Sequence, residues 1–106
     1  EITRAGWIGD YVDPNSFLDM MVTDRGNNMT GWSNSKYDDY LTKAAFSESE
    51  EDRITFFSEA EKILMDELPI IPIYTYTRVY MLKEEVKGWF PNMLDTHPYQ
   101  FISLED

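Results

Sequence analysis

A short stretch near the beginning of the chain, RAGWIGDYVDP, contains the residue types of a ligand site. Trp7, Gly9, Asp10 and Tyr11 bring aromatic rings, a flexible backbone and a carboxylate together where an expected strand ends. Ligand sites commonly combine aromatic walls with a few well-placed polar groups. The carboxylate of Asp10 can accept charge-assisted hydrogen bonds from an ammonium group, and Arg4 can pair with a carboxylate. We therefore treat this stretch as a candidate binding site.

The same residues also have a purely structural interpretation. Trp7 would then belong to the core and Asp10 would cap a turn, because aspartate is common in turns. Composition alone favours this second interpretation, so the residue types by themselves leave both open.

The sequence offers little that could support catalysis. The one histidine, His97, lies in a turn-like Thr-His-Pro context, where a surface position is expected, because a triad needs a positioned nucleophile and base. The sequence contains neither a glycine-rich phosphate loop nor a cluster of metal ligands. The acidic run from Glu48 to Asp52 is interpreted as solvated charge at a helix start, where the helix dipole favours it. We therefore expect a protein that is not an enzyme and uses no cofactor or metal.

Charge and composition narrow the possible partners. The 106 residues include 20 Asp and Glu against 9 Lys and Arg, which gives a net charge of −11. This balance argues against nucleic acid and against an anionic membrane surface, because both require clustered basic residues. Apolar residues make up 42%, enough for a core, and cysteine is absent, which excludes disulfides and thiolate metal sites. The apolar runs are too short for a transmembrane helix.

Helices are expected in the middle of the chain, where they would support the candidate site. The dipeptide Asp13-Pro14 is a helix-start signal and predicts a short helix over 14–21. A loop rich in Gly, Asn, Ser and Thr should follow over 23–35. Apolar spacing then predicts helices over 36–46 and 50–67. In the second of these, Ser49 should cap the start, Pro69 should end the helix, and one largely apolar face is expected to contain Ile54, Phe57, Ala60, Glu61, Leu64 and Leu68.

Strands are expected at both ends of the chain. The residue types predict a short strand over 2–8, a long strand over 70–82 and a last strand over 99–104. The fold class is therefore α/β, with strands at both ends and helices between. The long strand has few possible partners within so short a chain, which suggests that the chain belongs to something larger.

The chain contains three separated motifs in this order: RAGWIGDYVDPNSFLDMM, NNMTGWSNSKYD and EAEKILMDELPIIPIYTY. Together they resemble the C-terminal part of the oligopeptide-binding proteins, which are solute receptors of ABC-type peptide importers. The resemblance implies a fragment of a two-lobed periplasmic-binding-protein-like (type II) fold. Residues 1–76 would form the second half of the C-terminal lobe, and residues 77–106 would return across the hinge to the first lobe.

The resemblance also implies roles for the candidate site. Asp10 matches the aspartate that anchors the free α-amino group of the peptide, and Trp7 matches a tryptophan that lines a side-chain pocket. Arg4 matches an arginine that meets the peptide's C-terminal carboxylate in some members. Gly9 and Tyr11 flank Asp10 and complete the expected peptide-binding set. Ile8 occupies the place of a cysteine that some relatives use in a disulfide.

The resemblance also implies partners and a location for the receptor. The ligand would be an oligopeptide, and the membrane permease subunits of an ABC importer would receive it. The receptor would work outside the cytoplasmic membrane, in the periplasm or as a lipid-anchored lipoprotein at the cell surface.

Two alternatives remain. One is a receptor of the same superfamily with another ligand, such as a dipeptide, a nickel chelate or an oligosaccharide; Asp10 favours peptides over sugars, which have no ammonium. The other is a small acidic domain whose aromatic surface binds a protein. The mass of the particle in solution distinguishes this second alternative from a receptor fragment. An independent domain should be monodisperse at 12.5 kDa, whereas a fragment should oligomerise or swap segments.

Overall fold

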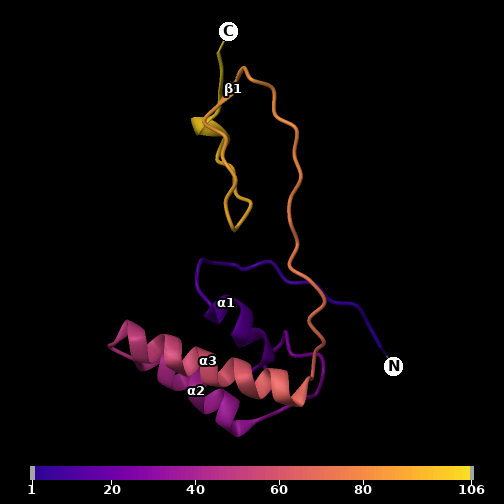
Figure 1. Cartoon of the computed structure of the whole chain (residues 1–106), viewed down its shortest axis with the longest axis vertical. Coiled ribbons are helices and arrows are strands. Elements are labelled where there is room, and N and C mark those ends of the chain that lie inside the picture. Colours follow the sequence, from indigo (N-terminus) through magenta and orange to yellow (C-terminus); the bar gives the residue numbers. More distant parts are fainter. Residues whose placement is uncertain (1, 106) are drawn as a thin grey trace. The chain divides into compact units, whose positions relative to one another are not determined.

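The computed structural model of the chain describes residues 2–105 and consists of two compact units, one ending at Pro72 and the other beginning at Ile73 (Figure 1). The first unit contains every α-helix of the described chain. The second contains the paired strands.

The first unit is built on two helices that run side by side, α2 (Ser35–Phe46) and α3 (Glu50–Glu67) (Figure 1). Both begin at a side-chain cap, which satisfies backbone N–H groups that have no partner within the helix. The side chain of Asn34 accepts hydrogen bonds from the backbone N–H groups of Lys36 and Tyr37, at 2.9 and 3.1 Å. Ser49 caps α3 by accepting from the N–H of Asp52. The predicted helices over 36–46 and 50–67 are thereby confirmed, including the cap at Ser49.

The core of this unit lies between the two helices and the segment that precedes them. Its buried hydrophobic members are Met21, Tyr37, Leu41, Ala44, Phe57, Ala60 and Leu64. Tyr37 is fully buried, and its hydroxyl donates to the carbonyl oxygen of Leu18 at 2.6 Å. Burial raises the pKa of this hydroxyl, so Tyr37 serves the core as a neutral hydrogen-bond donor.

The apolar face predicted for α3 is only partly correct. Its middle is buried, but Ile54 is 57% exposed, Leu68 is 49% exposed, and Glu61 is exposed as well. Leu68 lies beyond the last helical residue and has a left-handed backbone (φ 47°). Its side chain therefore does not continue the apolar face of the helix. Helical spacing identified the centre of the face, but Ile54 and Glu61, seven residues apart, lie along its exposed edge, and Phe56 and Ile63 pack against the core instead.

The predicted short helix over 14–21 is confirmed as two consecutive pieces. They are the four-residue α1 (Asn15–Leu18) and the 3₁₀-helix η1 (Asp19–Met21). The loop that follows is tied to them by Asn28, whose side-chain amide donates to the carbonyl oxygens of Met21 and Trp32, at 3.1 and 2.8 Å.

The predicted strands over 2–8 and 70–82 are wrong, since neither segment pairs in a sheet within residues 2–105. The segment 70–82 is rich in β-branched and aromatic residues, which favour strands, but a strand requires a neighbour to satisfy its backbone groups. Without a neighbour, Val79 and Met81 remain 93% and 99% exposed. The expected arrangement of strands at both ends is therefore found only at the C-terminal end.

The second unit contains a small antiparallel ladder. Strand β1 (Val86–Lys87) pairs with β2 (Ser103–Leu104), so that Val86 lies opposite Leu104. The predicted strand over 99–104 is correct only in its last part, because Tyr99–Phe101 forms the 3₁₀-helix η2. Gly88 has a φ of +78°, and a Cβ there would lie 1.8 Å from the carbonyl oxygen of Phe101, so only glycine fits beside the ladder.

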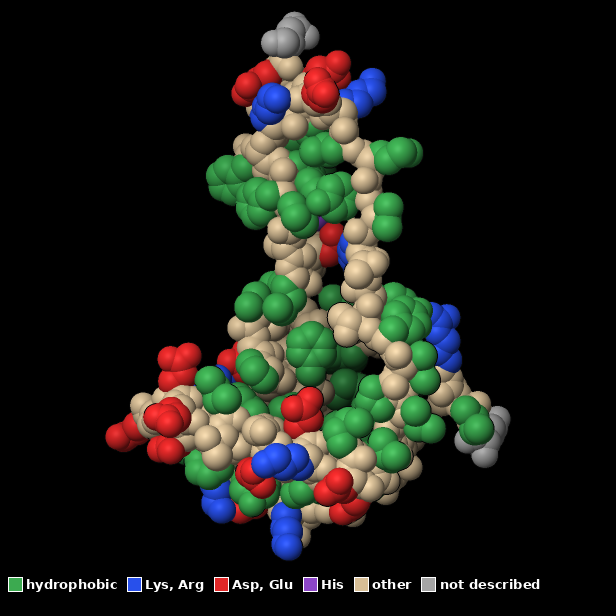
Figure 2. All heavy atoms as spheres, in the orientation of Figure 1, with side chains coloured by type: hydrophobic (Ala, Val, Ile, Leu, Met, Phe, Trp, Pro, Cys, Tyr) green, Lys and Arg blue, Asp and Glu red, His purple; other side chains and the backbone are tan. Residues whose placement is uncertain are grey.

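Aromatic stacking stabilises the rest of the second unit, where hydrophobic side chains gather (Figure 2). The ring of Trp89 contacts Tyr80, at 4.1 Å between centroids, and stacks on His97, at 4.4 Å with nearly parallel planes. The Nε2 atom of His97 lies 3.0 Å from Asp95, which also pairs with Arg78 at 2.7 Å. His97 is thus a packed member of this cluster and not the surface residue that was predicted. No helix in the described part of the chain is long and apolar enough to cross a membrane.

Candidate functional site

The candidate stretch around Asp10 is held against α1 by one buried residue, Ser16. Its side chain is 4% exposed. The carbonyl oxygen of Ser16 accepts a hydrogen bond from the indole Nε1–H of Trp7 at 2.7 Å. Its hydroxyl oxygen accepts another from the backbone N–H of Asp10, also at 2.7 Å. Trp7 and Asp10 are therefore both attached to the same residue of α1.

Gly9 lies between these two attachment points and is buried. A Cβ at Gly9 would lie 3.0 Å from the Cζ atom of Phe17, closer than side chains normally approach. Glycine thus lets the backbone lie flat against the phenyl ring. Phe17 is 42% exposed and packs beside Gly9, whereas Leu18 and Met21 contribute to the core.

Only the backbone N–H of Asp10 takes part in the contact with Ser16. Asp10 is exposed, and its carboxylate makes no hydrogen bond or ion pair with residues 2–105. Tyr11 is 45% exposed, and its hydroxyl accepts from the side-chain amide of Asn15 at 2.9 Å. The backbone at Asp10 is thus fixed, while its charged group is available to a ligand.

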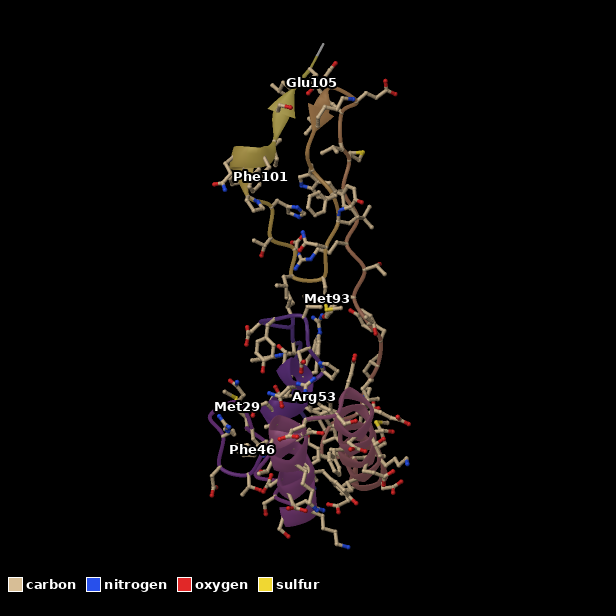
Figure 3. The ribbon with its side chains drawn as sticks, turned by 90° about the vertical axis from the view of Figure 1, so that its left-hand side faces the viewer. Met29, Phe46, Arg53, Met93, Phe101 and Glu105 are labelled. Atoms are coloured by element: carbon tan, nitrogen blue, oxygen red, sulfur yellow. The ribbon has the colours of Figure 1, made fainter. Side chains whose placement is uncertain are left out.

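The far end of the stretch is held to α3 by an ion pair between Asp13 and Arg53. Arg53 is labelled in Figure 3. The guanidinium Nη2 lies 2.8 Å from the carboxylate of Asp13, and the backbone N–H of Asn15 also donates to that carboxylate, at 2.9 Å. The hydrogen bond from Arg53 is the main reason why the pKa of Asp13 lies below its usual value. Asp13 therefore remains charged and structural, which distinguishes it from Asp10.

The structure brings together four of the five predicted site residues, namely Trp7, Gly9, Asp10 and Tyr11, beside α1. Arg4 lies in the exposed segment that precedes Trp7 and takes no part in the contacts with Ser16. Its role stays a prediction. Sequence reasoning missed Ser16 and Arg53; a serine two residues after Asp-Pro is a possible signal for the first, but nothing in the sequence pairs Arg53 with Asp13.

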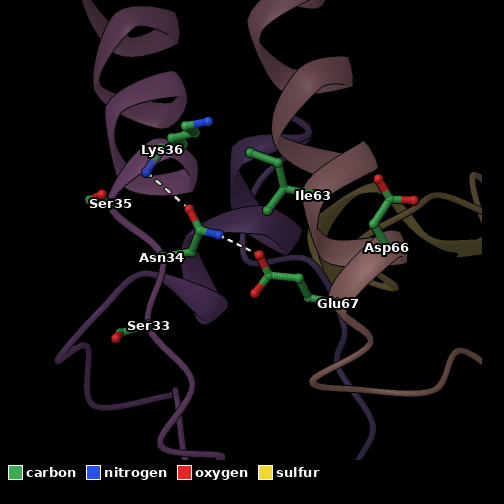
Figure 4. Close-up of a pocket in the computed structure, with 7 residues that line it drawn as sticks. All are labelled: Ser33, Asn34, Ser35, Lys36, Ile63, Asp66 and Glu67. Carbon is green, nitrogen blue, oxygen red and sulfur yellow. Dashed lines mark hydrogen bonds between the residues drawn. The ribbon is translucent and has the colours of Figure 1, made fainter.

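A second hollow lies between the start of α2 and the end of α3, lined by Asn34, Lys36, Ile63 and Glu67 among others (Figure 4). It is wide open to solvent, and Glu67, one of the two acidic residues that line it, is already hydrogen-bonded. Glu67 accepts from the amide of Asn34 at 2.6 Å and from the indole N–H of Trp32 at 2.7 Å. These bonds hold the loop before α2 against α3. The residues around the hollow therefore stabilise the fold. Residues 2–105 contain no group of three acidic or histidine side chains placed to hold a metal ion.

Comparison with known proteins shows what the chain as a whole is similar to. No family model matches the chain. The dipeptide-binding protein DppE of Bacillus subtilis is 35% identical over 105 residues, which cover 99% of this chain and 18% of DppE. The periplasmic murein peptide-binding protein MppA of Escherichia coli is 36% identical over 89 residues, covering 84% of this chain and 17% of MppA. The oligopeptide-binding protein OppA of Bacillus subtilis is 37% identical, over 83% of this chain and 16% of OppA.

The chain is homologous to the peptide-binding proteins of ABC importers. The resemblance found in its motifs is thereby confirmed. Solved structures of MppA agree, since one of them matches 92% of this chain with a TM-score of 0.83 and 32% identity, and an unliganded open form matches with a TM-score of 0.74. These neighbours support the periplasmic-binding-protein fold, and the relatives are binding proteins and not enzymes. The chain spans less than a fifth of the length of the relatives it matches.

Proposed function

We propose that this chain is part of an extracytoplasmic receptor that captures peptides and delivers them to the permease subunits of an ABC transporter. The named relatives support the proposal, because they are binding proteins for dipeptides, oligopeptides and murein peptides. The chain corresponds to only 16–18% of each of these relatives, so the remainder of the cleft would come from other parts of the receptor.

The observation that carries the proposal is the state of Asp10. Its backbone is fixed on Ser16, whereas its carboxylate is exposed and has no partner within residues 2–105. A carboxylate that is enclosed when a cleft closes needs a cationic partner, because an unpaired buried charge is costly. The α-ammonium group of a peptide supplies that partner.

The other predicted site residues have supporting roles in this proposal. Trp7 lines a pocket for a peptide side chain, and Gly9 keeps the backbone close to α1. Tyr11 forms part of the exposed wall beside Asp10. Arg4 meets the C-terminal carboxylate of peptides of suitable length.

An oligopeptide is the proposed ligand, and a dipeptide is the second candidate. The second is favoured by relatives named as dipeptide-binding proteins, DppE of Bacillus subtilis at 35% identity and a protein of Escherichia coli at 25%. Asp10 would bind the ammonium of either ligand. Affinities for peptides of two to five residues distinguish them.

The proposed location is outside the cytoplasmic membrane. Relatives that are named periplasmic, such as MppA and SapA, support it. Attachment through a lipid anchor is part of the same proposal, and mass spectrometry of the mature receptor tests it.

Calorimetric titration of the complete receptor with one short peptide, in free and N-acetylated forms, tests the role of Asp10. Acetylation removes the ammonium, so we expect binding to weaken by about 2–5 kcal/mol, as for other buried charge pairs. Asp10→Ala should weaken binding of the free peptide much more than that of the acetylated one. Equal losses for the two peptides would contradict the proposal.

A further inference from the structure

We propose that Ser16 is the positioning residue for peptide recognition, and that its hydroxyl sets the place of the Asp10 carboxylate. This inference rests on the proposed function, because it concerns how Asp10 meets the ammonium group. Ser16 itself does not touch the ligand.

The first argument is the burial of Ser16. It is the only buried polar residue within residues 2–105, at 4% exposure. A buried hydroxyl is costly unless it is hydrogen-bonded. At Ser16 the hydroxyl oxygen is occupied by the backbone N–H of Asp10, at 2.7 Å. The burial of this polar group is therefore linked to one contact, and that contact ends at the candidate ligand-binding residue.

The second argument is that two different atoms of Ser16 make the two contacts. The carbonyl oxygen of Ser16 holds the indole of Trp7, while the side-chain hydroxyl holds the backbone of Asp10. Substitution by alanine removes only the second contact, because the carbonyl oxygen stays in place. The chain thus permits a test in which Asp10 is released and Trp7 is kept.

The third argument is the tightness of the packing on either side. Gly9 lies against Phe17, and the carboxylate of Asp13 is fixed by Arg53. Between these points the backbone N–H of Asp10 is held by Ser16 through its side chain. Loss of the hydroxyl therefore loosens the backbone at Asp10 itself, while both ends of the stretch stay attached.

The test uses Ser16→Ala in the complete receptor, with the ratio of dissociation constants for the N-acetylated and free peptide as the readout. We expect the preference for the free peptide to fall about three- to tenfold, the size of one lost hydrogen bond. Affinity for the acetylated peptide should change less than about twofold, since that ligand does not use the charge of Asp10. Hydrogen exchange at the Asp10 amide should accelerate in the same variant.

Thr23→Val is the matched control. The hydroxyl of Thr23 is buried and has no partner in the described chain, so its removal takes away a buried hydroxyl without touching Asp10. The peptide preference should remain that of the wild type. If Ser16→Ala does not fold, Ser16→Cys serves instead, because a thiol has nearly the same shape but is a weak acceptor. It should lower the preference in the same direction.

Equal weakening of both peptides by Ser16→Ala would assign Ser16 a general structural role and overturn the inference, as would an unchanged preference. If the wild-type receptor shows no preference for the free amine, the proposed role of Asp10 fails, and the positioning role fails with it. If Asp10→Ala abolishes the preference but Ser16→Ala leaves it intact, only the inference about Ser16 fails.

Discussion

The ion pair between Asp13 and Arg53 joins the candidate stretch to α3, and its contribution depends on pH. The bond from Arg53 holds the pKa of Asp13 below the ordinary value of 3.8, against the opposing effect of burial. A carboxyl whose pKa is lower in the folded than in the unfolded chain stabilises the fold above the unfolded value. That stabilisation is lost as the pH falls through the folded pKa.

We therefore expect Arg53→Met to lower the free energy of unfolding at pH 7 by about 1 kcal/mol, a value for a partly exposed pair. Methionine keeps apolar contact with the ring of Phe57, over which the guanidinium lies at 4.6 Å. The difference from wild type should shrink as the pH is lowered below 3.8. Urea denaturation at a series of pH values measures it.

Lys43→Met is the control for this prediction. It removes the exposed pair between Lys43 and Asp39, at 2.7 Å on the surface of α2, and should have little effect on unfolding at any pH. A difference for Arg53→Met that is constant from pH 7 to below 3.8 would show that the pair does not act through the charge of Asp13.

At the residue scale, the sequence identified the charged and aromatic members of the site but not their support. Asp10 and Trp7 stand out because carboxylates and indoles have distinctive chemistry. Ser16 does not, because a serine becomes informative only when the turn brings its hydroxyl to 2.7 Å from the N–H of Asp10. Arg53 was equally hidden, since its partner lies 40 residues away.

At the scale of elements, Asn34 links the start of α2 to the end of α3. It caps α2 through its oxygen and donates to Glu67 through its nitrogen. We expect Asn34→Ala to destabilise the first unit by about 1–2 kcal/mol, the usual cost of a lost cap with an additional hydrogen bond. Thermal unfolding followed by circular dichroism measures this loss.

Glu67→Ala separates the two functions of Asn34. It removes the bonds from Asn34 and Trp32 but leaves the cap of α2 intact, so its effect should be smaller than that of Asn34→Ala. Equal losses in the two variants would mean that the cap of α2 contributes no more than the hydrogen bond from Trp32 to Glu67.

Helices and strands differed in how well the sequence predicted them, and the reason is physical. The signals for α2 and α3 are local, because caps and helical spacing act within a few residues. Those for the segments 2–8 and 70–82 are not, because a strand forms only when a neighbour completes its ladder. The only ladder in the described chain joins Val86–Lys87 to Ser103–Leu104, and turn geometry at Gly88 positions it.

At the scale of the whole molecule, two observations indicate that the segment over 73–82 pairs with another chain. Its apolar side chains are exposed, and the chain spans only part of each relative. Residues 73–82 are rich in β-branched and aromatic side chains but form no ladder within residues 2–105, and the chain matches less than a fifth of each relative. Unpaired strand-like segments with exposed apolar side chains offer a template for pairing with another chain. A second copy of the chain can then provide the strand pairing that residues 73–82 do not make within residues 2–105.

We therefore expect the isolated chain, whose monomer mass is 12.5 kDa, to form larger assemblies of itself at micromolar concentrations. Val79→Lys should reduce that association, because charge on an unpaired segment opposes strand pairing, and it also removes an apolar side chain. Thr77→Lys adds the same charge to the same segment without removing an apolar group, so it should have the smaller effect. Sedimentation velocity distinguishes the three chains. A wild-type chain that remains a monomer at 12.5 kDa throughout the concentration series would contradict the prediction and favour a small domain that is stable by itself.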